Sequence, residues 1–503
     1  MHLFAILFAA IAFVPIDDRP VTAQLPVMVG RIAGVDVAEP PRPLLGRFLQ
    51  SGKSDALIAW LNGQVAKPHT GAFVVSTDML AYGGLTASRI PGATYADAEF
   101  RLRELAHLRR RRPSAWIGAF GTIMRLAPTG IPAGTSFFAP YPTWLYLQEY
   151  ANLHDPLLPS ETARAAQLQQ LIGSATLDAY LATRARNLDV DRLLLKMTAA
   201  GTIDRLVLGQ DDAGPVGLHV ADVRLLQADL GAQGLAGRVS IEPGADELGI
   251  ALVAHAIARR AHWTPRLAVH YSTPQGALYQ DPIEYAPIST AIDALIRVSG
   301  GVHDDDHPDI ALYVRVPQTA SAQDDAFVAE MSADRSAGRA VALADLSYLH
   351  SYAEQAAFAR RILASGLASQ LDAYSSWNTN ANTVGTALAE AIAAGAGRRT
   401  NTYDALAHRT FTFVMFLDDY AFHDEVRPDL NATLAAQGIE DHSLLEPGVA
   451  ATISQRGRTL LWMYAEQILA QLDPGYHIAA MKIGLPWSRT FETSIDVGLA
   501  PNL

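Results

Sequence analysis

The stretch Arg205–Gly214, RLVLGQDDAG, decides the fold class of this chain. It is a short apolar run that ends in a glycine and leads into a pair of aspartates. Similar runs, rich in Val, Ile, Leu and Phe, recur along the 503 residues, and segments with helical periodicity lie between them. Continuous rather than alternating apolarity is typical of strands that are covered on both faces, as in a parallel sheet. The alternation predicts an α/β fold of repeating β-α units.

Nine segments are predicted to be strands: Ile11–Ile16, Ala72–Ser76, Ala115–Phe120, Arg205–Leu208, Arg238–Ile241, Arg266–His270, Asp309–Val314, Ala340–Ala344 and Gln370–Ser375. The helices predicted between them include Asp97–Arg111, Val220–Leu230, Glu247–Arg260, Ser351–Leu363 and Thr383–Ala394. Two architectures fit this series: a (β/α)8-like barrel, or two Rossmann-like lobes that split near Ala261–Pro265. Both place ligands at the carboxyl ends of the strands, so the expected site is the same.

The chain is long enough for two or three packed regions. We expect an N-terminal α/β unit at residues 1–262, with a long insertion at 126–202. A second α/β unit, or the remainder of a barrel, follows at 263–398, and a mainly helical region follows at 399–503. Insertions of this length often form lids or substrate walls.

Composition excludes several classes of protein. The net charge of −12 argues against nucleic acid and anionic membranes as partners, because both attract basic surfaces. The chain has no cysteine, which excludes disulfides, thiolate catalysis and Cys-ligated metals. The apolar run Leu3–Val14 fits either a signal-peptide core or a buried strand. We favour the strand, because no Lys or Arg precedes the run. No segment is predicted to be transmembrane, the expected location is cytoplasmic with secretion or the periplasm as alternatives, and no oligomeric state is indicated.

Acidic motifs follow four of the predicted strands, namely the first, second, fourth and fifth. The residues singled out in these motifs are Asp17, Asp18, Arg19, Asp78, Tyr82, Arg89, Asp211, Asp212, Asp246 and Glu247. Each motif alone also has a structural interpretation, as a turn, an ion pair or a helix N-cap. Their repetition on one side of the fold favours a functional site. So many acids would repel one another unless they bind a cation, hydrogen-bond a polyol or share protons.

The pair Asp246-Glu247 predicts acid catalysis of glycoside cleavage. A glycosidase needs one carboxylic acid to protonate the leaving oxygen and a second group to stabilise the oxocarbenium-like centre. Burial or a neighbouring carboxylate would raise the pKa of such an acid. By analogy with hexosaminidases, Glu247 would be the acid and Asp246 would orient an acetamido group, with Asp212 as a further catalytic candidate. The structural alternative is an N-cap, since both residues precede a predicted helix.

A Trp followed by polar amides comes after the ninth predicted strand, in Tyr374–Gly385, YSSWNTNANTVG. Trp377 could stack on a sugar ring, and Asn378 and Asn380 could bind its hydroxyls. The alternative is that these residues cap the following helix. Two later stretches, FLDDY at 416–420 and GLPWSRTFE at 484–492, carry another Asp pair and a Trp with Arg489.

Six stretches together resemble a known bacterial family. FVPIDDRP, TDMLAYGGLTASR, GQDDAGP, PGADE, WNTNANTVG and PWSRTFE look like the domain of unknown function 4127, and they extend over nearly the whole chain. The resemblance implies no particular activity. It does imply that the strand-end motifs form one unit.

The expected function is therefore that of a glycoside hydrolase acting on a small carbohydrate such as an N-acetylhexosaminide, with no required cofactor. One alternative is a metal-dependent hydrolase, in which Asp17, Asp78 and Asp211 would bind Mg²⁺, Mn²⁺ or Ca²⁺ through oxygen atoms. The other is a two-lobed sugar-binding protein that closes on its ligand.

Overall fold

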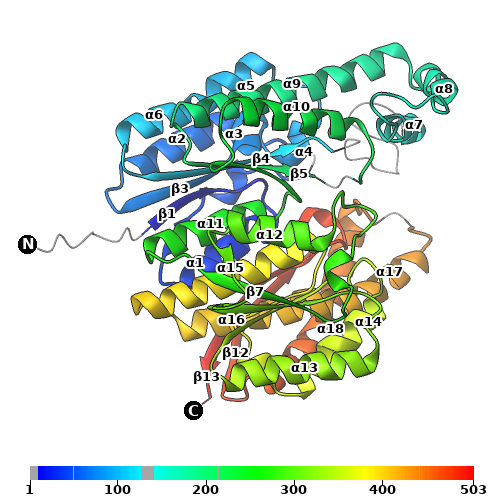
Figure 1. Cartoon of the computed structure of the whole chain (residues 1–503). Coiled ribbons are helices and arrows are strands. Elements are labelled where there is room, and N and C mark those ends of the chain that lie inside the picture. The colour runs from blue at the N-terminus through cyan, green and yellow to red at the C-terminus, as the bar shows by residue number, and fades with distance from the viewer. Residues whose placement is uncertain (1–9, 49, 126–140, 212–213, 441, 503) are drawn as a thin grey trace, which may run out of the picture. The chain divides into compact units, whose positions relative to one another are not determined.

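The computed structural model describes residues 10–48, 50–125, 141–211, 214–440 and 442–502. Internal packing divides the chain into two units (Figure 1). Unit 1 comprises Met1–Asp18, Asp36–Leu252 and Gln280–Pro287, and unit 2 comprises Arg19–Val35, Val253–Tyr279 and Ile288–Leu503. Neither unit is contiguous in sequence, whereas the division expected at residue 262 is contiguous.

Unit 1 contains a sheet of six parallel strands in the order β2-β1-β3-β4-β5-β6. The strands are β1 (Ala10–Val14), β2 (Asp36–Ala38), β3 (Thr70–Ser76), β4 (Trp116–Ile123), β5 (Arg205–Gln210) and β6 (Val239–Pro243). Every residue of β1 and of β4 is buried, which agrees with strands covered on both faces. The described residues of Leu3–Val14, from Ala10 onward, thus form a buried strand. Residues 3–9 lie outside the described part of the chain.

The helices of unit 1 are α2 (Ser54–Val65), α3 (Thr77–Tyr82), α4 (Leu85–Ser88), α5 (Tyr95–Leu102), α6 (Glu104–Arg111), α7 (Tyr141–Ala151), α8 (Thr162–Ile172), α9 (Ser174–Ala199), α10 (Leu218–Ala232) and the start of α11 (Leu248–Arg260), with a short 3₁₀ turn at Arg42–Leu44. The helix predicted at Asp97–Arg111 is two helices, α5 and α6. Thr94 begins α5 with a capping box, in which its side chain accepts from the Asp97 amide and the Asp97 carboxylate accepts from the Thr94 amide.

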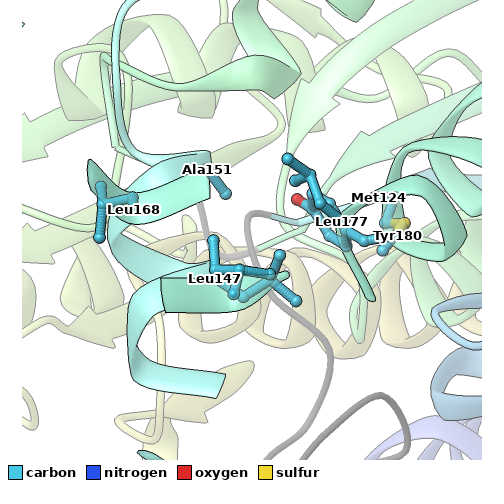
Figure 2. Close-up of a cluster of buried hydrophobic side chains, with 7 residues drawn as sticks. Met124, Leu147, Ala151, Leu168, Leu177 and Tyr180 are labelled. Carbon is cyan, nitrogen blue, oxygen red and sulfur yellow. The ribbon is translucent and has the colours of Figure 1, made fainter. Parts of the chain in front are cut away.

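The long insertion after β4 has an apolar core of its own (Figure 2). This core is built from Met124 and side chains of α7, α8 and α9, namely Leu147, Ala151, Leu168, Ile172, Leu177 and Tyr180. Because α9 carries part of this core and also packs against β4 and β5, it joins the insertion to the sheet.

Unit 2 contains a second sheet, of five parallel strands in the order β8-β7-β9-β10-β11. The strands are β7 (Arg266–Tyr271), β8 (Val302–His303), β9 (Ile310–Arg315), β10 (Ala340–Asp345) and β11 (Ala373–Ser375). Numbered within the unit, this order is 2-1-3-4-5, as for the first five strands of the other sheet. The α/β prediction is therefore confirmed in the form of two open sheets, and the barrel alternative is wrong.

The helices of unit 2 are α1 (Leu25–Ile32), α12 (Ile288–Val298), α13 (Ser321–Ser336), α14 (Tyr352–Ala364), α15 (Asn380–Thr400), α16 (Ala405–Met415), α17 (Arg427–Ala435) and α18 (Pro447–Leu472), with π-helical segments η1 (Pro20–Gln24) and η5 (Phe416–Val426) and 3₁₀ turns at Gly276–Leu278, Ala368–Gln370 and Pro486–Ser488. Helix α15 is buried over nearly its whole length and is rich in Ala and Gly, so neighbouring elements can approach it closely.

The C-terminal region is mainly helical, as predicted, and ends in an antiparallel pair that was not predicted. Strands β12 (Tyr476–Gly484) and β13 (Ser494–Pro501) pair with each other, and the PWSRTFE stretch connects them. Over the described residues, no helix is both long enough and apolar enough to cross a bilayer.

Candidate functional site

The carboxyl edge of the unit 1 sheet collects the acidic motifs that follow β1, β3, β5 and β6. All of these strands run parallel, so their carboxyl ends lie at one edge. The strand order reverses between β1 and β3, and in open α/β sheets ligands bind at such a switch point. Asp17 and Asp18 follow β1, and Asp78 follows β3 directly.

Asp78 lies in the first turn of α3, which begins where β3 ends. Ser76 caps this helix by accepting a hydrogen bond from the Met79 amide at 3.2 Å. Oδ2 of Asp78 accepts two hydrogen bonds from Thr122 on β4, from the backbone N–H at 2.8 Å and from Oγ1 at 2.9 Å. Burial has the largest effect on the pKa of Asp78 and raises it, and the negative charge of Asp211 also raises it, whereas the hydrogen bonds from Thr122 and the positive charge of Arg89 lower it. The resulting pKa is about 7.

Arg89 forms an ion pair with Asp211 next to Asp78. Both side chains are buried, and the guanidinium donates to Oδ2 of Asp211 in a short hydrogen bond. Arg89 follows α4, and Asp211 follows β5, so residues 122 positions apart meet at this edge. The structure thereby brings together three of the residues singled out from the sequence: Asp78, Arg89 and Asp211.

Helix α9 supplies polar residues that the sequence did not single out. Arg186 lies over the ring of Tyr82 at 4.4 Å and donates to the Ser88 carbonyl at 2.6 Å, so it fixes the turn that precedes Arg89. Asp191 is buried, and burial together with the charge of Asp78 raises its pKa well above the usual range. Asn187 also donates to the Ser88 carbonyl, at 2.9 Å. The spacing of Asn187 and Asp191 is a signal that could have been used, since residues i and i+4 share one helical face.

A cavity of about 590 Å³ lies beside Tyr82. Its other lining residues are Ser51, Gly52, Lys53, Ser54, Asp55, Ala56, Gly92, Ala93, Asp97 and Arg101. Tyr82 is four residues after Asp78 on α3, so the two share a helical face. The cavity therefore reaches the helix that carries Asp78, although Asp78 is not among its lining residues.

The paired glycines after α3 serve the chain's own packing. Gly83 has φ of +94°, and a Cβ there would lie 2.7 Å from the Gly52 nitrogen. The Gly83 carbonyl accepts a hydrogen bond from that same nitrogen at 2.7 Å. The close backbone approach that Gly83 permits is thus made by residues 51–52 of the chain itself.

The DDR motif after β1 is divided between the units. Asp17 is buried in unit 1, and Asp18 is half-buried, with its amide donating to the Gly46 carbonyl at 3.1 Å. Arg19 belongs to unit 2, where its guanidinium lies 5.2 Å from the centre of the Trp487 ring. Arg19 therefore has a packing partner of its own in unit 2.

Glu247 is fully buried, and its side chain folds back onto Gly244. The glycine has φ of +93°, and a Cβ there would come within 2.1 Å of Oε1 of Glu247. No other described residue donates a well-aligned hydrogen bond to the carboxylate oxygens of Glu247. The backbone amides of residues 245 and 247 lie near these oxygens. Burial raises the pKa of Glu247 well above its usual range, and the charges of Asp246 and Glu284 add to this. Asp246 is half-buried, and Asp212 lies outside the described residues.

Trp377, Asn378 and Asn380 lie in unit 2, at the carboxyl end of β11. Trp377 is 3% exposed, and one face of its ring is stacked on His423 with 4.9 Å between ring centres. Asn378 adopts a positive φ of 70°, which Asn tolerates better than most residues. Asn380 is the first residue of α15, which Thr379 caps. The capping interpretation thus accounts for part of this motif.

A second group of buried acids, carried by the π-helical segment η5 that begins with the FLDDY stretch, lies at the same edge of unit 2. Oδ2 of Asp419 accepts from the Ser376 amide at 2.6 Å and from Oγ of Ser375 at 3.1 Å. Burial raises the pKa of Asp419 to about 7 and that of Asp424 to about 10. The π-helical segment η5 carries both acids, and π-helical turns are frequent at functional sites.

One family of proteins matches nearly the whole chain. The family described as "Protein of unknown function (DUF4127)" matches residues 11–496. The chain belongs to this family. No curated protein and no solved structure matches the chain. The DUF4127 match extends over both units and includes every candidate residue named above.

The two acidic groups differ in what they can do chemically. The group in unit 1 combines a carboxyl whose pKa lies near neutrality with an ion-paired carboxylate, which suits proton transfer. Among the described residues, no three His, Asp or Glu side chains are arranged to hold a metal ion as they stand.

Proposed function

We propose that this DUF4127 protein is a hydrolase that cleaves a polar, sugar-like substrate, a glycoside, by carboxylate acid–base chemistry in unit 1. The observation that carries the proposal is Asp78, a buried carboxyl at the topological switch point whose pKa is about 7. A group that transfers protons at neutral pH works best when its pKa is near that pH. A carboxylate that only binds a ligand does not require a pKa near neutrality.

Asp78 and Asp211 are the pair that we assign to the two carboxyl roles. Asp78 is the general acid, and Asp211, held by Arg89, is the carboxylate that stabilises the developing positive charge. The charge of Asp211 acts on Asp78, so the two carboxyls are close enough to interact. Environments that push two neighbouring carboxyls toward different protonation states are the usual basis of acid and base assignments.

Glu247, the acid predicted from the sequence, is the less favoured donor. Its strand, β6, is three positions from β3 in the sheet, and strands are about 4.8 Å apart, so the two strand ends lie roughly 14 Å apart. Glycosidase carboxyl pairs are separated by only about 5–9.5 Å. Asp78 and Glu247 therefore do not suit the two roles of one reaction. The burial of Glu247 against Gly244 fits a role in shaping the turn before α11.

The cavity beside Tyr82 supports a sugar-like substrate. Its volume of about 590 Å³ falls in the range of small-molecule sites. Hydroxyls from Ser51 and Ser54 and charges from Lys53, Asp55 and Arg101 line it, and such groups hydrogen-bond to polyols.

A panel of chromogenic aryl glycosides tests the proposal. The full-length protein should release the aryl group from at least one glycoside or N-acetylhexosaminide, and it should do so after treatment with EDTA. If activity is lost in EDTA and restored by Mn²⁺ or Mg²⁺, the metal-dependent alternative with Asp17, Asp78 and Asp211 replaces this mechanism. If sugars bind in calorimetry and none of the glycosides is cleaved, the sugar-binding alternative, which the two similar open sheets favour, replaces it.

A further inference from the structure

A small cavity lies in unit 2 at the amino edge of its sheet, at the opposite end of β11 from the acids of η5. Residues 368–372, which lead into β11, form one wall of it. Three arginines from three helices also line it: Arg335 from α13, Arg398 from α15 and Arg409 from α16. The cavity has a volume of about 240 Å³. Pockets for drug-sized ligands usually have about 300–1,000 Å³, so this one suits a smaller ligand.

A buried carboxylate, that of Asp372, holds two of the three arginines in place. Oδ1 accepts from Nη1 of Arg398 at 2.5 Å, and Oδ2 accepts from Nη1 of Arg335 at 2.6 Å. Oδ2 also accepts from the Val341 amide at 3.0 Å, and the Asp372 side chain is only 1% exposed. One carboxylate neutralises one guanidinium, so the second leaves a positive charge at the cavity.

The guanidiniums are fixed by further contacts and still have N–H groups to donate. Nε of Arg409 lies 3.0 Å from Oδ2 of Asp473, and the guanidinium of Arg398 lies 4.8 Å from the centre of the Tyr403 ring. Nε of Arg335 is buried and has no hydrogen-bond partner among the described residues. Each guanidinium carries five N–H donors, and these contacts use only part of them.

The charges around the cavity favour an anion. Its lining contains three guanidiniums and one carboxylate, and Asp473 adds a second carboxylate beside Arg409. Glu390 is not a lining residue, since it is fully buried and already accepts from Oγ1 of Thr412 at 2.8 Å. The side chains of Arg335, Arg398 and Arg409 are 25%, 42% and 27% exposed, so an anion can reach them from solvent.

We propose that this cavity binds a phosphate group, free or carried by a small metabolite, through Arg335, Arg398 and Arg409. Guanidinium groups donate forked, charge-assisted hydrogen bonds to phosphate oxygens. Three of them suit the charge of a phosphate dianion better than that of a single carboxylate. The site lies in unit 2, and the proposal does not depend on the hydrolase activity proposed for unit 1.

Calorimetric titration of the full-length protein in a phosphate-free buffer of low ionic strength tests this site. We expect one inorganic phosphate or one glycerol 3-phosphate to bind per chain, more tightly than the dicarboxylate succinate, and the binding to weaken as NaCl is added. Arg398→Gln and Arg409→Gln should each weaken phosphate binding by about 10-fold or more. Arg399→Gln is the matched control, because Arg399 is the next residue on α15 but donates to Asp309 at 2.9 Å and does not line the cavity.

The proposal is overturned by no saturable phosphate binding to the wild type, by wild-type affinity in both cavity variants, or by an equal loss of affinity in Arg399→Gln. Binding of succinate as tight as that of phosphate also overturns it. If the cavity variants fail to fold, modification of wild-type arginines by phenylglyoxal decides the matter. Phosphate should protect Arg398 and Arg409 and leave Arg399 reactive, and equal labelling with and without phosphate would contradict the site.

Discussion

Thr122 donates two hydrogen bonds to a single carboxylate oxygen of Asp78, one from its backbone N–H and one from its hydroxyl. Both favour the ionised carboxylate, whereas burial favours the neutral acid. The balance of these opposing effects holds the pKa of Asp78 at about 7. The hydroxyl of Thr122 is thus a means of changing the proton affinity of Asp78 without touching Asp78.

Thr122→Val should move the pH profile of the proposed hydrolase activity. Val keeps the shape and the backbone donor but lacks the hydroxyl, so the pKa of Asp78 should rise. A charged hydrogen bond is worth roughly 1.5–3 kcal/mol, which corresponds to about one pH unit or more. The limb of kcat/KM that falls at high pH should shift upward by this amount, and Thr122→Ser should restore it. An unshifted limb in Thr122→Val would mean that Asp78 is not the group that titrates.

The stability of the protein should depend on pH through Asp78. Its pKa is about 7 in the folded protein and 3.8 in the reference state, so the folded form binds this proton more tightly. The raised pKa of Asp78 therefore contributes roughly 4 kcal/mol to the free energy of unfolding at low pH. This contribution is complete below about pH 4 and is lost as pH rises through 7. The non-titrating Asp78→Asn variant should therefore gain stability relative to the wild type between pH 5 and pH 8 in urea unfolding. If the free energies of unfolding of the wild type and Asp78→Asn differ by the same amount at every pH in this range, the pKa of Asp78 is not raised.

Arg89→Gln should destabilise the protein, because it removes the guanidinium that neutralises the buried Asp211. Breaking a buried ion pair on one side costs about 3–5 kcal/mol. The double variant Arg89→Met/Asp211→Leu should regain most of the lost stability, because it removes both charges and leaves neither buried without its partner. Thermal unfolding of the two variants measures the difference. Equal destabilisation by the single and the double variant would show that the ion pair is not what the fold requires.

Glu247→Gln should alter activity by less than about 10-fold and leave the melting temperature nearly unchanged. A carboxyl held protonated by burial is close in shape and charge to the Gln amide. Loss of a general acid would instead lower kcat by roughly 10²–10⁴-fold. A decrease of that size, with the melting temperature unchanged, would restore the assignment made from the sequence and remove Asp78 from the role of acid.

The strands of the two sheets were predictable because each is a continuous apolar run. All nine predicted strands are present, and the strands that were missed in the sheets are β2 and β8, of three and two residues. Strands of two or three residues are too short to show a recognisable hydrophobic pattern. The β12–β13 pair was missed for another reason. Its strands are partly exposed and antiparallel, so they lack the continuous apolar run of the buried strands, and the sequence before them has a mostly helical pattern.

The candidate site was only partly predictable. Asp78, Arg89 and Asp211 were found because their motifs follow strands of one parallel sheet. Thr122 lies inside β4 and Arg186 inside α9, where no local signal marks them as partners of Asp78 and Tyr82. The sequence also could not reveal that Arg19 belongs to a different unit from Asp17, because adjacent residues are expected to share one environment.

The most direct test of the account is the turnover number of Asp78→Asn compared with that of Asp204→Asn on the best aryl glycoside. Asp204 lies at the opposite, amino edge of the same sheet, where its carboxylate accepts from the Ile117 amide at 2.7 Å. We expect kcat to fall by roughly 10²–10⁴-fold in Asp78→Asn and to stay within about a factor of three in Asp204→Asn. The loss should shrink for glycosides whose leaving groups need little protonation. Equal activity of Asp78→Asn and the wild type would contradict the central claim.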